Sequence, residues 1–236
     1  MSLPVTFVAA QDLKDETVWS WARVEGTLDQ KDQEEASSTK FPYSIEWHYR
    51  LKNDARDFHQ MLLRPMLGYN LDANSTLWVG YAWIGQDANG EFVNEHRLFQ
   101  MITTKGKVGE TPVVYLAGAR LEQRVLENQE ELNHRLRLSL RFSIPLKQNK
   151  NYKLNLIFQD EIFVRLNQTN WAGAQGYDQN RFYVGLEHQT KIKDTPVSFN
   201  AGYQYLHTPT KGTHMLNVGL RININQGKKK KKPRSF

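Results

Sequence analysis

The chain has 236 residues, of which 39% are hydrophobic, 11% aromatic and 24% charged, and it contains no cysteine. No apolar run approaches the roughly 18–20 residues that a membrane-spanning helix needs, which excludes a helical membrane protein but not a membrane β-barrel. The lack of cysteine excludes a disulfide framework and any thiolate metal site.

The formal net charge of +6 comes from one short segment at the end of the chain. Lys228 to Lys232 and Arg234 carry six positive charges, so the sequence before them is neutral. We expect residues 227–236 to form a disordered basic tail. Nucleic-acid binding would depend on this tail alone, and we expect no nucleic-acid partner.

Residues 1–10 read MSLPVTFVAA. Val8 and Ala10 have the small-residue spacing of a signal-peptidase site, and apolar residues precede them. The basic start and long apolar core of a full signal peptide are missing, so we interpret residues 1–10 as a signal-peptide remnant. A short first strand is the alternative. Residues 17–225 are assigned to one folded domain.

From about Val18 onward, apolar and polar residues alternate with a period of two, which predicts β-strands rather than helices. In Phe41–Leu51, for example, Ile45 and Trp47 share a face opposite Glu46 and His48. The expected strands, about eleven in all, are 17–28, 41–51, 59–71, 76–86, 93–104, 113–124, 133–146, 152–166, 180–189, 195–206 and 216–224. Polar turns such as 52–54, 87–90 and 147–150 join them.

Alternation alone does not say which face is inside, and a soluble sandwich or lipocalin-like barrel also alternates. Strands of roughly 10–14 residues favour a membrane barrel, because a tilted bilayer crossing needs about 9–11 and globular strands average about 5–6. Aromatic residues near strand ends suit an interfacial girdle, and they include Phe41, Trp47, Tyr49, Tyr69 and Tyr152. The sequence therefore predicts an all-β protein, a single up-and-down antiparallel transmembrane β-barrel of the Gram-negative outer membrane.

Single-chain bacterial barrels have an even number of strands, so we expect ten to twelve, with twelve preferred. The two longest expected loops are 29–40 and 167–179. Both should face the outside, because periplasmic turns are short, yet eleven strands would place them on opposite sides. We therefore expect a split or missed strand between them, or a first long loop that is periplasmic.

Several segments carry a resemblance to a known family. They are Trp19, Gly68-Tyr69, Gly80-Tyr81, residues 94–100 (NEHRLFQ) and residues 180–186 (NRFYVGL). With these, the chain over about residues 17–225 resembles the bacterial domain-of-unknown-function 2490 family, which is regarded as outer-membrane barrels without an assigned activity. The resemblance implies location and architecture, and it supplies no catalytic residues.

The most informative residues on the polar face are ten arginines and four glutamates, with Glu161 nearby. We expect this set to line the barrel interior: Arg50, Arg64, Arg97, Arg120, Arg124, Arg135, Arg137, Arg141, Arg181, Arg221, Glu46, Glu95, Glu122 and Glu187. Arginine is permanently charged and offers a planar fork, so it suits both carboxylate pairing and anion recognition.

Two interpretations of this set stay open. Cross-strand ion pairs could fill a closed lumen, leaving a structural barrel whose loops bind a ligand. Alternatively, the excess of arginine could line a narrow, porin-like channel that favours anions. Arg135, Arg137 and Arg141 have no alternating acids on their own strand, which keeps the channel hypothesis open. The expected partners are outer-membrane lipid, lipopolysaccharide and small anionic solutes.

A membrane-embedded lipid hydrolase is a second alternative. His207 and His214 flank a short loop, but no Ser–His spacing typical of a nucleophilic site stands out, and we expect no enzyme. His134 and His188 fall in the apolar register and are expected at the membrane interface. The acidic group of Asp29, Asp32, Glu34 and Glu35 is interpreted as a solvated loop, so we expect no metal and no cofactor.

Overall fold

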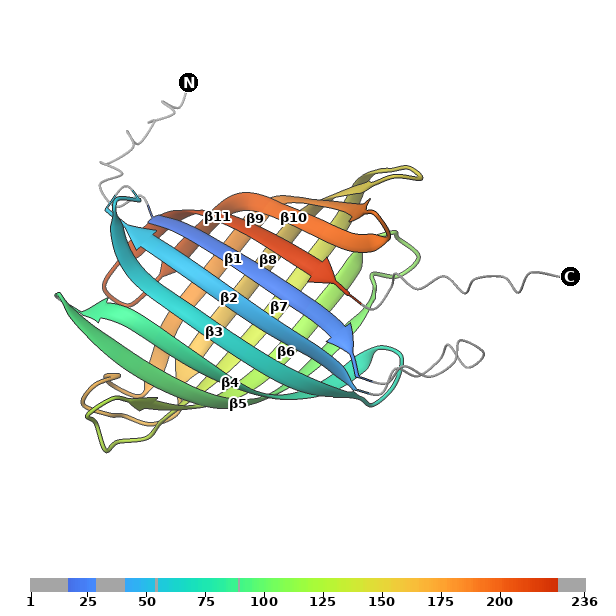
Figure 1. The fold of residues 1–236 in the computed structure, drawn as a ribbon. Coiled ribbons are helices and arrows are strands. Elements are labelled where there is room, and N and C mark those ends of the chain that lie inside the picture. The colour runs from blue at the N-terminus through green and yellow to red at the C-terminus, as the bar shows by residue number, and fades with distance from the viewer. Residues whose placement is uncertain (1–16, 29–40, 54, 89, 225–236) are drawn as a thin grey trace, which may run out of the picture.

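The computed structural model describes residues 17–28, 41–53, 55–88 and 90–224, which form eleven β-strands closed into a single barrel (Figure 1). The strands are β1 Thr17–Thr27, β2 Pro42–Lys52, β3 Asp57–Asn70, β4 Ser75–Ala88, β5 Glu91–Lys107, β6 Val114–Leu126, β7 Asn133–Gln148, β8 Lys153–Arg165, β9 Gly176–Ile192, β10 Thr195–His207 and β11 Gly212–Asn223. Residues 1–10 and 227–236, interpreted as a signal-peptide remnant and a basic tail, lie outside the described residues. Among those described, no helix has the length and apolar character needed to cross a membrane.

The strand count of eleven lies within the expected ten to twelve, but it is odd and so differs from the preferred twelve. Each strand pairs antiparallel with its sequence neighbour, and an odd number of such reversals leaves β1 and β11 running in the same direction. They close the barrel as a parallel pair, in register from Thr17 opposite Met215 to Glu25 opposite Asn223. The evenness rule assumes antiparallel closure, which this seam does not use.

The odd count also places the two chain ends of the barrel at opposite rims (Figure 1). We call the rim where β1 begins the proximal end; it carries the connections between β2 and β3, β4 and β5, β6 and β7, β8 and β9, and β10 and β11. The distal end, where β1 finishes, carries the turns at 71–74, 108–113, 149–152 and 193–194. The loop at 166–175 is therefore proximal, whereas the other expected long loop, 29–40, lies outside the described residues.

The turn between β3 and β4 illustrates how local chemistry ends a strand. The carboxylate of Asp72 accepts hydrogen bonds from the backbone N–H groups of Asn74 (2.7 Å) and Ser75 (2.8 Å). These two donors lower the pKa of Asp72, because they stabilise its ionised form. Such an Asx turn reverses the chain within four residues and starts β4 in register with β3.

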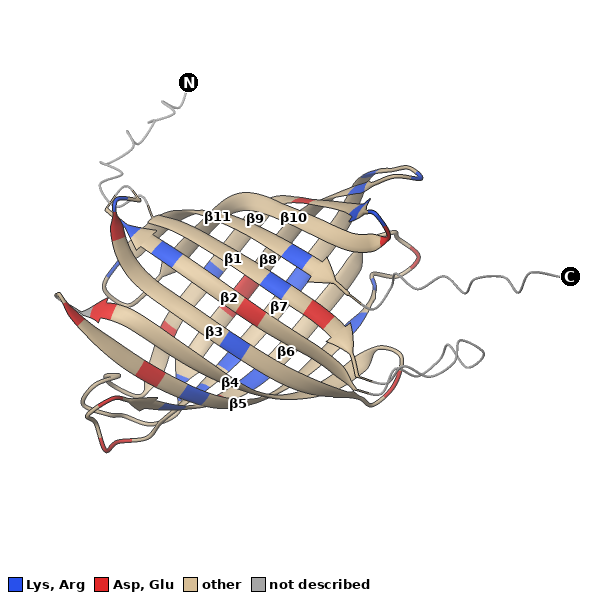
Figure 2. Cartoon of the chain, in the orientation of Figure 1, with Lys and Arg blue, Asp and Glu red and all other residues tan. Residues whose placement is uncertain are grey.

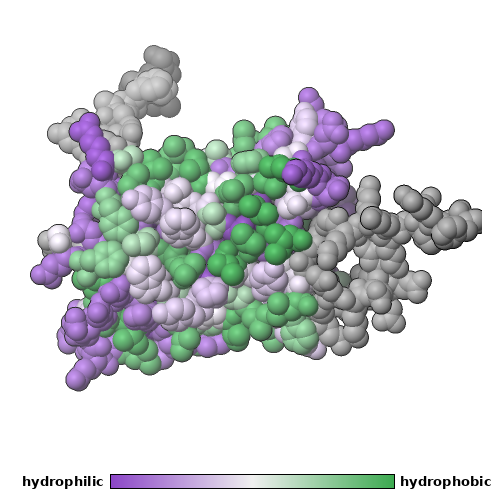
Figure 3. Space-filling view, in the orientation of Figure 1, coloured by the Kyte–Doolittle hydropathy of each residue, from purple (hydrophilic) through white to green (hydrophobic). Residues whose placement is uncertain are grey.

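The apolar face of the alternation points outward and the charged face points inward, as the sequence predicts. On β2, Ile45 and Trp47 are 46% and 57% exposed, whereas Glu46 between them is 1% exposed. The outward aliphatic residues at strand centres include Leu63, Val79, Leu98, Leu138, Leu186 and Leu216. Hydrophobic side chains run across the strands in Figure 3, and hydrophilic ones gather at the rims.

Outward aromatic rings gather towards the rims. Phe41 and Tyr69 pack together at the distal end with ring centroids 5.6 Å apart. Phe58 packs at the proximal end with Tyr49 (5.6 Å) and Phe92 (6.1 Å). Trp47, expected near a strand end, instead lies at the middle of β2.

The barrel has no large dry centre. The buried apolar cluster of the described residues comprises Leu62, Ala82 and Ile84, and most other buried side chains are polar or charged. Figure 2 shows positive and negative residues along the central parts of the strands. The arrangement is thus the reverse of that in a globular protein, because the apolar side chains face outward and the charged ones face the interior.

Candidate functional site

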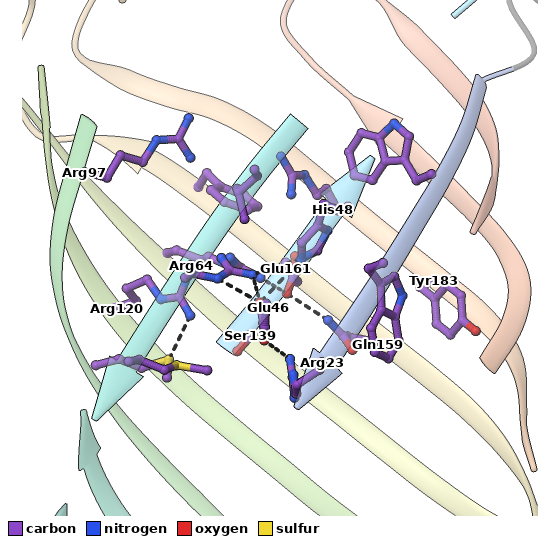
Figure 4. Close-up of a pocket in the computed structure, with 18 of the residues that line it drawn as sticks. Arg23, Glu46, His48, Arg64, Arg97, Arg120, Ser139, Gln159, Glu161 and Tyr183 are labelled. Carbon is purple, nitrogen blue, oxygen red and sulfur yellow. Dashed lines mark hydrogen bonds and ion pairs between the residues drawn. The ribbon is translucent and has the colours of Figure 1, made fainter. Parts of the chain in front are cut away.

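The barrel encloses a cavity of about 770 Å³, and Figure 4 shows part of its lining. Its lining includes Trp171 and Ala172 of the proximal loop and Asn74 of a distal turn. Residues from both rims therefore border one continuous space.

Of the fourteen residues expected to line the lumen, twelve line this cavity and the other two lie behind them. The ten arginines line the cavity together with Glu46 and Glu95. Glu122 and Glu187 lie behind them, 2% and 3% exposed, and are bonded to arginines of the lining. Arg23, Lys105, Glu25, Glu161 and Asp178 add charged groups to the lining that the predicted set did not contain.

Glu46 on β2 shows how the charges are arranged. Its carboxylate is bonded by Arg23 on β1 and Arg64 on β3, which approach it from the two neighbouring strands (Figure 4). Arg23 and Glu46 lie directly opposite in the β1–β2 register, as do Glu46 and Arg64 in the β2–β3 register. Inward residues on adjacent strands are close enough to pair, so the ladder follows from the register.

The other interior carboxylates repeat this arrangement. Glu95 pairs with Arg97 (2.7 Å) and Arg124 (2.6 Å), and Glu122 pairs with Arg135 (2.6 Å) and Arg120 (3.7 Å). Glu187 pairs with Arg141 (3.1 Å) and Arg221 (3.7 Å), and Asp178 pairs with Arg135 (2.8 Å) and Arg165 (3.0 Å). Glu161 pairs with Arg137. Most of these carboxylates are therefore paired with two arginines each.

Arg135, Arg137 and Arg141 are ion-paired in the structure, although their own strand carries no alternating acids. Their partners come from β6, β8 and β9, so each is compensated across the barrel wall. A pattern read along one strand cannot detect such partners. These three arginines are consequently not the uncompensated charges of the lumen.

The lumen nevertheless carries an excess of positive charge. Eleven arginines and Lys105 line the cavity, against the carboxylates of Glu25, Glu46, Glu95, Glu161 and Asp178. Adding the two acids behind the lining, Glu122 and Glu187, gives seven negative charges against twelve positive ones. The difference is five positive charges within the described part of the barrel.

Two arginines of the lining, Arg50 on β2 and Arg181 on β9, have no carboxylate oxygen within 4.0 Å among the described residues. Both instead lie against the indole of Trp19, with guanidinium carbons 3.7 Å and 5.0 Å from its ring centroid. Arg181 also lies 4.6 Å from the ring centroid of Phe163. Cation–π contacts of this kind stabilise a guanidinium without neutralising its charge.

Inward aromatic rings are the part of the site that sequence reasoning missed. Trp19, Phe99, Phe163 and Tyr183 are all at most 8% exposed, and the first, third and fourth line the cavity. Because aromatic residues were assigned to the membrane interface, their inward phase was overlooked. That phase was readable, since Trp19 shares its face with Arg23, and Phe163 shares its face with Glu161.

The histidines considered for catalysis lie elsewhere. The Nδ1 atoms of His207 and His214 are bonded by the hydroxyls of Tyr177 (2.8 Å) and Tyr203 (2.5 Å), and Tyr205 packs against both rings. His188, expected at an interface, stacks on Tyr152 near the distal rim. The described residues hold no group of three or more His, Cys, Asp or Glu side chains arranged for a metal, and the acidic residues at 29–35 lie outside them.

Comparison with known proteins agrees with this architecture. The family described as "Protein of unknown function (DUF2490)" matches residues 17–217. The chain belongs to this family. It is also 33% identical over 185 residues to an uncharacterized protein of Methylorubrum extorquens, a match that covers 76% of this chain and 79% of the relative. No solved structure matches the sequence significantly.

The DUF2490 match begins with the first residue of β1 and ends within β11, so it covers almost the whole barrel. It contains every charged residue of the lumen described above except Arg221. The resemblance expected from the sequence is therefore confirmed. The DUF2490 name carries no activity, so function has to be argued from the lumen.

Proposed function

We propose that this DUF2490 protein is an outer-membrane β-barrel whose lumen forms a narrow channel that favours small anions. The observation that carries the proposal is the continuous cavity of about 770 Å³, lined from rim to rim and holding five more positive than negative charges. Rings of arginine or lysine favour anions in pores, because their field lowers the free energy of an anion in the narrow part.

The outward surface supports a membrane location. Strands of 11 to 17 residues exceed the roughly 9–11 needed to cross a bilayer at a tilt. The lipid would cover the exposed leucine, valine and isoleucine side chains, and the aromatic rings near the rims would lie at the headgroups. In water, so large an apolar surface would drive association. The partners proposed are therefore outer-membrane lipid and lipopolysaccharide, with small anionic solutes in the lumen.

Planar-bilayer electrophysiology tests the proposal. Purified, detergent-folded protein is inserted into a bilayer separating two concentrations of potassium chloride. An anion-favouring channel gives single-channel steps and a reversal potential displaced toward the chloride equilibrium potential. Cation-biased or unselective current would contradict the charge argument, and a bilayer that stays sealed despite inserted protein would contradict the channel itself.

A second candidate is a structural barrel with a closed lumen. It is favoured by the paired carboxylates, since Glu46, Glu95, Glu122 and Glu187 each hold two arginines in place. Such ladders fill a lumen and brace neighbouring strands. A sealed bilayer supports this candidate, whereas anion-biased conductance supports the channel. Both roles are passive, and we propose that the protein is not an enzyme.

A further inference from the structure

We infer that Arg50 and Arg181 form a binding site for a small oxyanion, such as phosphate, on the proximal side of the lumen. The site deepens the proposed function, because it names the class of anion that the channel would hold. Binding itself does not require the lumen to conduct. The inference rests on the contacts of these two arginines.

Arg50 and Arg181 differ from every other arginine of the lining. The other nine each have a carboxylate oxygen within 4.0 Å, namely Arg23, Arg64, Arg97, Arg120, Arg124, Arg135, Arg137, Arg141 and Arg221. Nine of the eleven arginines of the lining are paired with an acid, and the other two, Arg50 and Arg181, both lie against the same indole. This pattern of pairing argues that Arg50 and Arg181 are not left unpaired merely because the lumen has too few acids.

The hydrogen-bond donors of the two guanidinium groups are largely unused. Arg50 is 8% exposed and donates one hydrogen bond, to the side-chain oxygen of Gln60. Arg181 makes no hydrogen bond to any other described residue, and the Nε atoms of both arginines are buried without a partner. Buried polar groups in native proteins are nearly always bonded, so unused donors beside a cavity point to a missing acceptor.

The surrounding charges attract an anion rather than replace it. The charged groups acting most strongly on Arg50 are four other arginines, at positions 181, 97, 64 and 137. Glu161 is the acid that acts most strongly on Arg181, but its carboxylate is already bonded by Arg137. An incoming anion therefore meets several positive charges at Arg50 and Arg181, and the acid that acts on Arg181 is already paired.

The aromatic rings preorganise the site. Trp19, 6% exposed, contacts both guanidinium groups, although these come from strands on different parts of the wall. Phe163 adds a second ring beside Arg181. The rings hold the arginines in place and limit water around them, which strengthens each charge-assisted hydrogen bond in the low-dielectric lumen.

An oxyanion fits this arrangement better than a halide. A guanidinium presents parallel N–H groups in a planar fork that matches two oxygens of a phosphate, sulfate or carboxylate. Two forks around one cavity can bind different oxygens of the same small anion. Chloride offers a single acceptor and gains less from that geometry.

Isothermal titration of the detergent-folded protein with inorganic phosphate tests the site. The wild-type chain should bind phosphate and not chloride at the same ionic strength. Arg50→Gln and Arg181→Gln should each weaken binding about tenfold or more, because each removes charged donors. The matched control is Arg23→Gln, which removes the same charge from the lining while Glu46 keeps its bond to Arg64.

Several outcomes would overturn the inference. These are no phosphate binding by the folded wild type, unchanged affinity in both glutamine variants, or an equal loss in Arg23→Gln. Should a glutamine variant fail to fold, Arg50→Lys decides the question. It keeps the charge but lacks the fork, so weaker phosphate binding is expected, and unchanged affinity would count against the site.

The titration tests the binding site and the bilayer recording tests the channel, so either proposal can be contradicted while the other stands. Phosphate binding that both arginine variants lose, together with a sealed bilayer, would contradict the channel and leave the binding site standing. Anion-biased current without phosphate binding would overturn the site and leave the channel standing.

Discussion

Each interior carboxylate of this barrel influences more than its own charge. Glu46 is the clearest case, because its single carboxylate is bonded by Arg23 and Arg64 and also lies 3.4 Å from Nε2 of His48. Its removal leaves the buried Arg64 and the partly exposed Arg23 without this counter-charge. Glu25 on β1 faces the same cavity but has no ion pair among the described residues. Substituting the two glutamates in turn therefore separates the effect of ion pairing on stability from the effect of net charge.

We expect Glu46→Gln to lower the free energy of unfolding by about 3–5 kcal/mol, the usual cost of removing one partner of a buried pair. Glu25→Gln makes the same change in lumen charge and should stay within about 0.5 kcal/mol of the wild type. Urea unfolding of the detergent-folded protein measures both values. Equal losses in the two variants would show that net charge, rather than pairing, sets the stability.

At the scale of an element, the loop at 166–175 is held across the proximal rim. Arg165 donates hydrogen bonds to the carbonyl oxygens of Ala172 (2.7 Å) and Ala174 (2.7 Å). The indole of Trp171 donates to the backbone oxygen of Glu131 (3.0 Å) and lies 5.0 Å from the guanidinium of Arg124. Both Trp171 and Arg124 line the cavity, so this contact borders its proximal end.

If the lumen conducts, Trp171→Ala should increase single-channel conductance, because it removes the largest side chain that the loop contributes to the opening. Anion selectivity should change little, since no charge is altered. Trp47→Ala is the matched control, because Trp47 faces outward at mid-strand and should leave conductance unchanged. An unaltered conductance in Trp171→Ala would place the narrowest point elsewhere.

The strands could be predicted from the sequence because apolar and polar residues alternate with a period of two along most of the chain. All eleven strands were located, and the main error in their bounds concerns β9, expected at 180–189 and observed at Gly176–Ile192. The β8–β9 register shifts between Phe163 and Val164, and the successive residues Asp178 and Gln179 both line the cavity, so the alternation is broken there. A bulge of this kind hides the start of a strand from any prediction based on periodicity.

The pairing of the site was less predictable for the same reason. Which acid meets which arginine depends on the register between strands, as with Glu122 opposite Arg135. A single sequence does not reveal that register. The inward phase of the arginines was recognised, whereas the two uncompensated ones, Arg50 and Arg181, became apparent only when every cross-strand partner was known.

For the whole molecule, the decisive feature is the parallel seam between β1 and β11. Ser20 lies opposite Val218, and Val18 lies opposite Leu216. Paired residues of this kind suit a disulfide, which requires Cα atoms about 4.4–6.8 Å apart. Residues offset by two positions along neighbouring strands are beyond that range. The chain contains no cysteine, so an engineered pair has no competing thiol.

We therefore expect Ser20→Cys combined with Val218→Cys to form an intramolecular disulfide on mild oxidation of the folded protein. The product closes a loop over nearly the whole barrel, so it should migrate faster on a denaturing gel without reductant. Ser20→Cys combined with Leu216→Cys is the control and should remain reduced, because its partners are offset along the seam. The reverse result, or no cross-link in either variant, would contradict the parallel register. A twelfth strand between β1 and β11 would separate Ser20 from Val218, so efficient cross-linking of this pair also fixes the strand count at eleven.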